Sequence, residues 1–121
     1  MAGEGQRIKI EEKAFRFAKG VVELAMSLPQ NETRFVLGKQ LMRSGTSIGA
    51  NIEEAQGGIS KSEFIHSMNI AKKEARETIY WLRLLAEFDY VNKEKVNKLI
   101  GECEELIRML TSIVKTAQER R

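Results

Sequence analysis

Apolar residues recur at alternating spacings of three and four in four separate stretches of this chain, and only a few residues separate one stretch from the next. At 3.6 residues per turn, this alternation places the apolar side chains along one side of an α-helix. The spacing predicts helices over about 9–28, 31–56, 61–87 and 93–118. Connections this short make consecutive helices antiparallel. The pattern therefore predicts an all-α fold, an antiparallel up-down-up-down four-helix bundle that forms a single domain over residues 1–121.

Residues that commonly begin or end helices stand at the predicted boundaries. Ser60 and Glu63 form an S-x-x-E capping box, which is the strongest local signal in the chain. Asn31 is predicted to cap the second helix and Asn92 the last one. The glycines at 57–58 are expected to adopt left-handed conformations that end the second helix.

Composition places the chain among folded cytoplasmic proteins. Hydrophobic residues make up 42% and charged residues 31% of 121 residues, which is typical of a globular protein. The single cysteine, Cys103, cannot form an internal disulfide, and its apolar neighbours indicate a buried thiol in a reducing compartment. No signal-peptide-like or membrane-spanning apolar run is present, so no membrane partner is expected. The net charge of +3 is spread along the chain, and bulk charge alone therefore does not indicate nucleic-acid binding.

Apolar residues on the third and fourth predicted helices extend beyond a single stripe. The additional residues are Ile65, Ile70, Ile79, Trp81, Leu84, Ala86, Ile100, Ile107 and Val114. A helix that is apolar over more than half of its circumference requires a second partner. We expect a homo-oligomer. The alternative is a monomer in which these side chains widen the core.

A polar row follows one face of the second predicted helix beside its apolar stripe. Its members are Gln40, Arg43, Ser47, Asn51 and Glu54. The row is either a site that holds an anion or a partner, or a seam in which Arg43, Asn51 and Glu54 pair with groups on a neighbouring helix. Gly45 and Gly49 each cost about 1 kcal/mol relative to alanine inside a helix. Close packing against a neighbouring helix is the simplest compensation for this cost, and it favours the interpretation of the polar row as a seam.

A second polar row occupies the third predicted helix. It consists of His66, Asn69, Lys73, Arg76, Tyr80 and Arg83, with Lys72 beside it. Its cations and its tyrosine are candidates to follow a phosphate backbone and stack on a base, which makes Lys72, Lys73, Arg76, Tyr80 and Arg83 candidate nucleic-acid contacts. The alternative is a solvated face that Glu74 and Glu77 partly neutralise, with Lys73 and Glu77 as an i, i+4 ion pair.

No residue pattern indicates catalysis, a metal or a cofactor. Glu63 and His66 have the Glu-x-x-His spacing of di-iron bundles, but such a site needs a second pair and the chain has one histidine. Cys103 has no histidine partner to activate it. An enzyme is therefore not expected. An unrecognised active site would need a cleft assembled between subunits from Arg43, Glu54 and Glu77.

The segment RSGTSIGANIEEA, the following S-x-x-E-F and the later IAKKEARETIYWLRLL resemble the four helix bundle protein family. Its founding members are encoded by intervening sequences in bacterial large-subunit ribosomal RNA genes. The family motif maps onto Gln40, Arg43, Ser47-Ile48, Asn51-Ile52 and Glu53-Glu54-Ala55, and a family glutamate matches Glu77. Ala55 stands where the family has glycine, which predicts a longer second helix.

The resemblance implies a left-handed bundle that assembles as a homopentameric ring without known catalytic activity. A related group, the accessory proteins of diversity-generating retroelements, works with a reverse transcriptase and nucleic acid through a basic surface. We therefore expect a nonenzymatic, oligomeric protein that binds RNA or DNA, with structured RNA preferred and Lys72, Lys73, Arg76 and Arg83 touching phosphate. The alternative is a structural adaptor that binds another protein, such as a reverse transcriptase, through the polar row or Trp81, without direct nucleic-acid contact.

Overall fold

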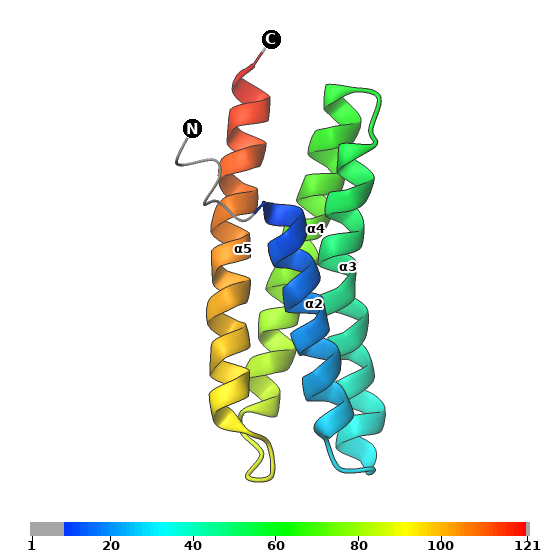
Figure 1. Cartoon of the computed structure of the whole chain (residues 1–121), viewed down its shortest axis with the longest axis vertical. Coiled ribbons are helices and arrows are strands. Elements are labelled where there is room, and N and C mark those ends of the chain that lie inside the picture. The colour runs from blue at the N-terminus through cyan, green and yellow to red at the C-terminus, as the bar shows by residue number, and fades with distance from the viewer. Residues whose placement is uncertain (1–8, 121) are drawn as a thin grey trace.

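A computed structural model describes residues 9–120 of the chain, and within that range it contains four α-helices, one π-helical segment and no strand. The elements are α2 (Ile10–Ser27), η1 (Thr33–Gly38, π-helical), α3 (Lys39–Gln56), α4 (Lys61–Leu85) and α5 (Lys93–Glu119). The helices lie side by side, with the α2–α3 and α4–α5 connections at the lower end of Figure 1 and the α3–α4 connection at the upper end. The predicted all-α fold with four helices is confirmed.

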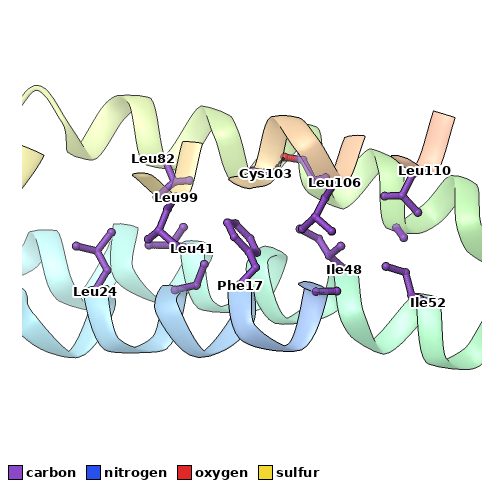
Figure 2. Close-up of a cluster of buried hydrophobic side chains, with 14 of the residues drawn as sticks. Phe17, Leu24, Leu41, Ile48, Ile52, Leu82, Leu99, Cys103, Leu106 and Leu110 are labelled. Carbon is purple, nitrogen blue, oxygen red and sulfur yellow. Dashed lines mark hydrogen bonds between the residues drawn. The ribbon is translucent and has the colours of Figure 1, made fainter. Parts of the chain in front are cut away.

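Each helix packs on its neighbours in the chain, and α5 also contacts α2, which closes the group around a common core. The core consists of the predicted apolar stripes, and Figure 2 shows side chains from different helices meeting at its centre. The alternating apolar spacing of the sequence includes Phe64 and Ile113, and these two positions are less buried than the rest of the core. Phe64 is half-buried, and near the end of α5 the buried residue is Val114 whereas Ile113 is half-buried. The α5 stripe therefore shifts by one residue near the end of the helix.

Side-chain caps hold three of the helix starts. The Ser60 hydroxyl accepts a hydrogen bond from the Glu63 amide at 3.1 Å, and the Asn92 side chain accepts one from the Lys95 amide at 3.0 Å. The Asn31 side chain accepts one from the Thr33 amide at 2.9 Å. Each cap satisfies an amide that has no partner inside its helix.

The second helix differs from the prediction at both ends. It begins with the wider turns of η1, which a 3.6-residue apolar period does not signal. At its other end the expected left-handed glycines are absent, because no glycine in residues 9–120 has a positive φ. The amides of Gly57 and Gly58 instead bond the carbonyl oxygens of Glu54 and Ala55 at 3.2 and 3.1 Å. This tightening of the last turn satisfies the final carbonyls without a left-handed residue.

Most of the additional apolar residues on α4 and α5 pack within this one chain. Ile65, Ile79, Trp81, Ile100 and Ile107 are partly buried against the core. Apart from Tyr80 on α4, the large hydrophobic side chains that stay exposed lie on the outer face of α2, in η1 and in the connections, where Phe15 is 70% and Phe35 is 72% exposed. Apolar surface available to another molecule is therefore concentrated on these elements rather than on the predicted α4 and α5 flanks. Within the described range, every helix is too short or too polar to cross a membrane.

Candidate nucleic-acid interface

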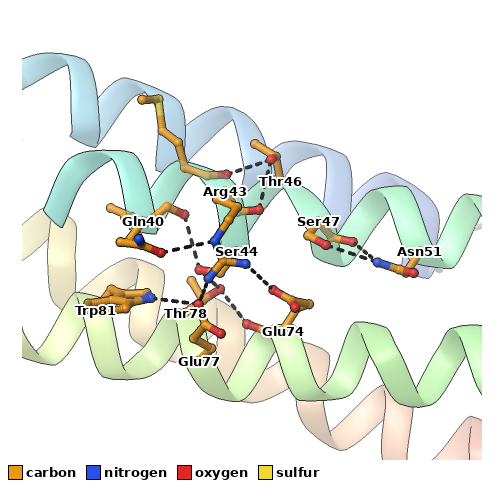
Figure 3. Close-up of polar contacts among 12 residues, drawn as sticks. Gln40, Arg43, Ser44, Thr46, Ser47, Asn51, Glu74, Glu77, Thr78 and Trp81 are labelled. Carbon is orange, nitrogen blue, oxygen red and sulfur yellow. Dashed lines mark hydrogen bonds and ion pairs between the residues drawn. The ribbon is translucent and has the colours of Figure 1, made fainter. Parts of the chain in front are cut away.

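Arg43 of α3 reaches across to α4 and organises a cluster of polar side chains (Figure 3). Its Nη1 lies 3.3 Å from a carboxylate oxygen of Glu74, and its Nη2 pairs with the carboxylate of Glu77. Its Nε donates to the side-chain oxygen of Gln40 at 3.1 Å. One guanidinium therefore holds two carboxylates of α4 at the α3–α4 junction.

Two aromatic residues extend this cluster along α4. The indole Nε1 of Trp81 donates to the same Glu77 oxygen at 3.1 Å. The Tyr80 and Trp81 rings meet edge to face, with centroids 5.1 Å apart and an interplanar angle of 74°. Edge-to-face contact is a favoured aromatic geometry. The position of the Tyr80 ring is therefore linked through Trp81 and Glu77 to Arg43.

Beneath this cluster, two fully buried hydroxyls join α3 to α4. The hydroxyl oxygens of Ser44 and Thr78 are 2.9 Å apart, and the Thr78 hydroxyl lies 2.7 Å from the carbonyl oxygen of Glu74. Buried polar groups are tolerated when they are hydrogen-bonded, as these are. The α3–α4 junction thus contains polar contacts in both its buried and its exposed parts.

The small residues of α3 face a different neighbour, α2. A Cβ added at Gly45 would lie 2.7 Å from Val21 Cγ1, and one added at Gly49 would lie 3.5 Å from the Ala14 Cβ. The close approach expected at the glycines therefore occurs against α2, whereas Arg43 and Ser44 bond to side chains of α4.

The rest of the polar row does not join the cluster. The Asn51 side chain donates to the Ser47 carbonyl at 2.8 Å and to the Ser47 hydroxyl at 3.1 Å, so it bonds within α3. Glu54 is exposed, and its carboxylate has no hydrogen-bond or ion-pair partner among residues 9–120. The structure brings together Gln40, Arg43 and Glu77 and leaves the other three row residues apart. Sequence reasoning did not place Glu74 and Trp81 in the cluster, although they are three residues before and four residues after Glu77 on the same helix side.

The cationic row of α4 lies on the outward side of the helix. Lys73, Arg76, Tyr80 and Arg83 are exposed, as are His66 and Asn69, and Lys72 is half-buried. None of its four cations has an ion-pair partner within the described part of the chain. The predicted Lys73–Glu77 pair is wrong, because Glu77 turns toward Arg43. Both carboxylates expected to neutralise the row are therefore engaged at the α3–α4 junction.

The remaining candidates from the sequence are a metal site and the Cys103 thiol. Residues 9–120 contain no cluster of three or more His, Cys, Asp or Glu side chains arranged to hold a metal ion. Cys103 is buried, and its Sγ donates to the Ala75 carbonyl oxygen at 3.2 Å. Burial, with a smaller contribution from the Glu104 charge, raises the pKa of this thiol to about 12. The thiol therefore stays protonated at neutral pH, which makes it a poor nucleophile.

Comparisons with known proteins agree with this architecture. The family model described as 23S rRNA-intervening sequence protein matches residues 6–112. The chain is also similar to a crystal structure, at 1.70 Å resolution, of a protein with unknown function from the S23 ribosomal protein family of Bacteroides thetaiotaomicron VPI-5482. That likeness has a TM-score of 0.83 and 42% identity, and it covers 88% of this chain and 99% of the other.

Among curated proteins, none matches the chain significantly. The family match spans most of the sequence, and the sequence motifs around Arg43 and Asn51 resemble the same family. The chain therefore belongs to the 23S rRNA-intervening sequence protein family.

Proposed function

We propose that this protein is a nonenzymatic, homo-oligomeric nucleic-acid-binding protein that prefers structured RNA. The observation that carries the proposal is the unpaired cationic row on the outward side of α4. Lys72, Lys73, Arg76 and Arg83 extend along about 16 Å of helix at 1.5 Å per residue. Cations without carboxylate partners remain available to displace counterions from phosphate, which is the main source of nucleic-acid affinity.

Tyr80 adds a second kind of contact to the row. Tyr80 is 58% exposed and stands between Arg76 and Arg83 on the same helix face. Exposed aromatic rings flanked by cations are suited to stack on bases of unpaired nucleotides. Phosphate contacts combined with stacking favour RNA that contains loops or bulges.

We further propose that the unit is an antiparallel up-down-up-down, left-handed bundle and that five copies form a ring in the cytoplasm. Support comes from the apolar residues exposed on one face of α2, Phe15, Val22 and Met26, which a second copy would cover. A ring repeats the cationic row around its circumference. Repetition raises the affinity for a long ligand through effective concentration, which offsets the modest charge of one chain.

A filter-binding titration against salt, with a stem-loop RNA, tests the RNA-binding proposal. We expect the Lys73→Glu/Arg76→Glu variant to lose at least about tenfold in affinity and to reduce the salt slope by about two, because each phosphate contact contributes roughly one unit. The matched control is Lys98→Glu/Lys115→Glu, which makes the same charge change on α5. Equal losses in both variants, or a flat salt slope in the wild type, would overturn the proposal.

Light scattering at micromolar concentration tests the oligomer. We expect a mass of five chains for the wild type and a smaller mass for Phe15→Glu/Met26→Glu, since this variant places charges on the apolar α2 face. A folded monomer in the wild type would contradict the ring.

A second candidate function is a structural adaptor that binds another protein, such as a reverse transcriptase, without touching nucleic acid. The neighbouring exposed side chains Phe35 and Val36 of η1 favour it, since contiguous exposed apolar surface often marks a protein-binding site. The polar row and Trp81 are less suitable docking groups, because Arg43 and the indole are already hydrogen-bonded within the chain. RNA binding that is lost on reversal of the α4 row argues against this candidate, and protein capture that depends on Phe35 without RNA affinity supports it.

A further inference from the structure

We infer that the hollow at the end of the cationic row, lined by Tyr80, Arg83, Leu84 and Glu87, binds an unpaired guanine base. This inference rests on the proposed RNA-binding function and names the base that the surface selects. The hollow has a volume of about 290 Å³. Tyr80, Arg83 and Leu84 share one face of α4 near its end, and Glu87 lies two residues beyond the end of that helix.

One wall of the hollow, the Tyr80 ring, is held in place before any ligand arrives. Trp81 packs edge to face against it, and the Trp81 indole is bonded to Glu77. Glu77 in turn pairs with Arg43, and Figure 3 shows this connection from the α3–α4 junction to Trp81. A ring that is already oriented loses little side-chain entropy when a base stacks on it.

The opposite end of the hollow is held by a lysine of the next helix. The Lys93 ammonium donates to the carbonyl oxygens of Ala86 at 2.7 Å and of Phe88 at 2.9 Å. These two residues flank Glu87, so the backbone that carries the Glu87 carboxylate is bonded on both sides. The two ends of the hollow are therefore positioned independently of each other.

The two charged lining residues keep their hydrogen-bonding capacity. Neither Arg83 nor Glu87 has an ion-pair partner or a side-chain hydrogen bond within the part of the chain that the structure describes. A carboxylate has two acceptor oxygens and no donor. Arg83 supplies a cation for the adjoining phosphate and offsets the repulsion between Glu87 and the RNA backbone.

Base chemistry then selects guanine. On its Watson–Crick edge, guanine presents two adjacent donors, N1–H and the N2 amino group, which match the two oxygens of Glu87. Adenine, cytosine and uracil each present an acceptor beside their donor on that edge, and an acceptor facing a carboxylate is left unpaired. Proteins read unpaired RNA bases through such edges while stacking them on aromatic rings.

Fluorescence anisotropy with a fluorescein-labelled uridine octamer that carries one guanosine, inosine or adenosine at its centre tests this inference. We expect the guanosine oligomer to bind the wild type about tenfold more tightly than the adenosine oligomer. A difference of this size corresponds to one additional hydrogen bond to a charged group. Inosine lacks the N2 amino group and should fall between them. The Glu87→Gln variant should lose this preference even if its overall affinity rises with the added charge, whereas the matched Glu53→Gln variant on α3 should retain it.

The single tryptophan supplies a direct readout at the site, because Trp81 touches Tyr80. We expect the guanosine oligomer to change Trp81 fluorescence in the wild type, and Tyr80→Leu to abolish both this change and the guanosine preference. Equal binding of guanosine and adenosine oligomers by the wild type, or an unchanged preference in Glu87→Gln, overturns the guanine inference and leaves the RNA-binding proposal standing. Absence of binding to these oligomers and to the stem-loop overturns both.

Discussion

On the side of α4 that faces α3, the carboxylates of Glu74 and Glu77 are bound to Arg43. On the outward side of the same helix, Lys73 and Arg76 have no carboxylate partner among residues 9–120. Both sides are rich in charge, so composition does not separate them. The difference is that one side has its partners within the chain and the other does not. Arg43 of α3 thus engages the two carboxylates that could otherwise neutralise cations of the outward face.

The largest change in the free energy of unfolding is expected at the close contact between α2 and α3. Gly45→Ala should lower the free energy of unfolding by about 2 kcal/mol, because its Cβ would lie 2.7 Å from a methyl carbon of the stiff Val21 side chain. Gly101, also inside a helix, has open space around it, so Gly101→Ala should raise stability by about 0.5–1 kcal/mol. Urea unfolding measures both. If the two variants shifted stability in the same direction, the close α2–α3 approach would not constrain the fold.

The second effect concerns the α4–α5 contact at Cys103. The pKa of this thiol is about 12 in the folded protein, against 9.0 for an unperturbed thiol. The unfolded chain therefore releases this proton at lower pH, and the thiol's contribution to stability, complete below pH 9, is lost as pH rises from about 9 to 12. Within that window, this group alone should make the free energy of unfolding fall as pH rises. Urea midpoints measured between pH 8 and 11 should decline less steeply for Cys103→Ala, and parallel declines would contradict the prediction.

The third effect tests whether Arg43 controls the charge of the outward face. Arg43→Gln should cost about 1 kcal/mol of stability, a modest value because the arginine side chain is 50% exposed. It should also release Glu77 toward Lys73, its i, i+4 neighbour, and so weaken RNA binding more than Lys98→Gln does.

A double variant separates this effect from a simple loss of charge. In a Lys73→Gln background, Arg43→Gln should have a smaller effect on RNA affinity, since the cation that Glu77 would neutralise is gone. Strict additivity of the two changes in filter binding would show that Arg43 does not act through Glu77.

The smallest effect on stability is expected on the outward face itself. Lys73→Gln/Arg76→Gln should change the free energy of unfolding by less than about 0.5 kcal/mol, because these exposed side chains have no partner within residues 9–120. The same variant should still lose RNA affinity. Thermal unfolding and filter binding on one preparation measure both, and a large loss of stability would place the row among the architectural contacts.

Local pattern was sufficient to predict much of the fold. The alternating apolar spacing identified the four helices, and the capping residues Ser60, Asn92 and Asn31 bond the amides expected of them. These features depend on residues within a few positions of one another, which a sequence displays directly. The π-helical start of the second helix and the negative φ of its terminal glycines were not predictable in this way. Both depend on how the helix ends fit against the rest of the chain.

Helix periodicity is enough to establish which residues share a helix face, and it places Lys73, Arg76, Tyr80 and Arg83 in one row. The partner of Glu77 depends on how the helices pack, because its i, i+4 neighbour Lys73 and Arg43 of α3 are both candidate partners for its carboxylate. Helix periodicity has no information about a partner on another helix, and packing of α3 against α4 brings Arg43 to Glu77. The glycines of α3 likewise predict a close approach by a neighbouring helix, because they lack side chains. Periodicity does not say which helix approaches, and the fold shows that it is α2.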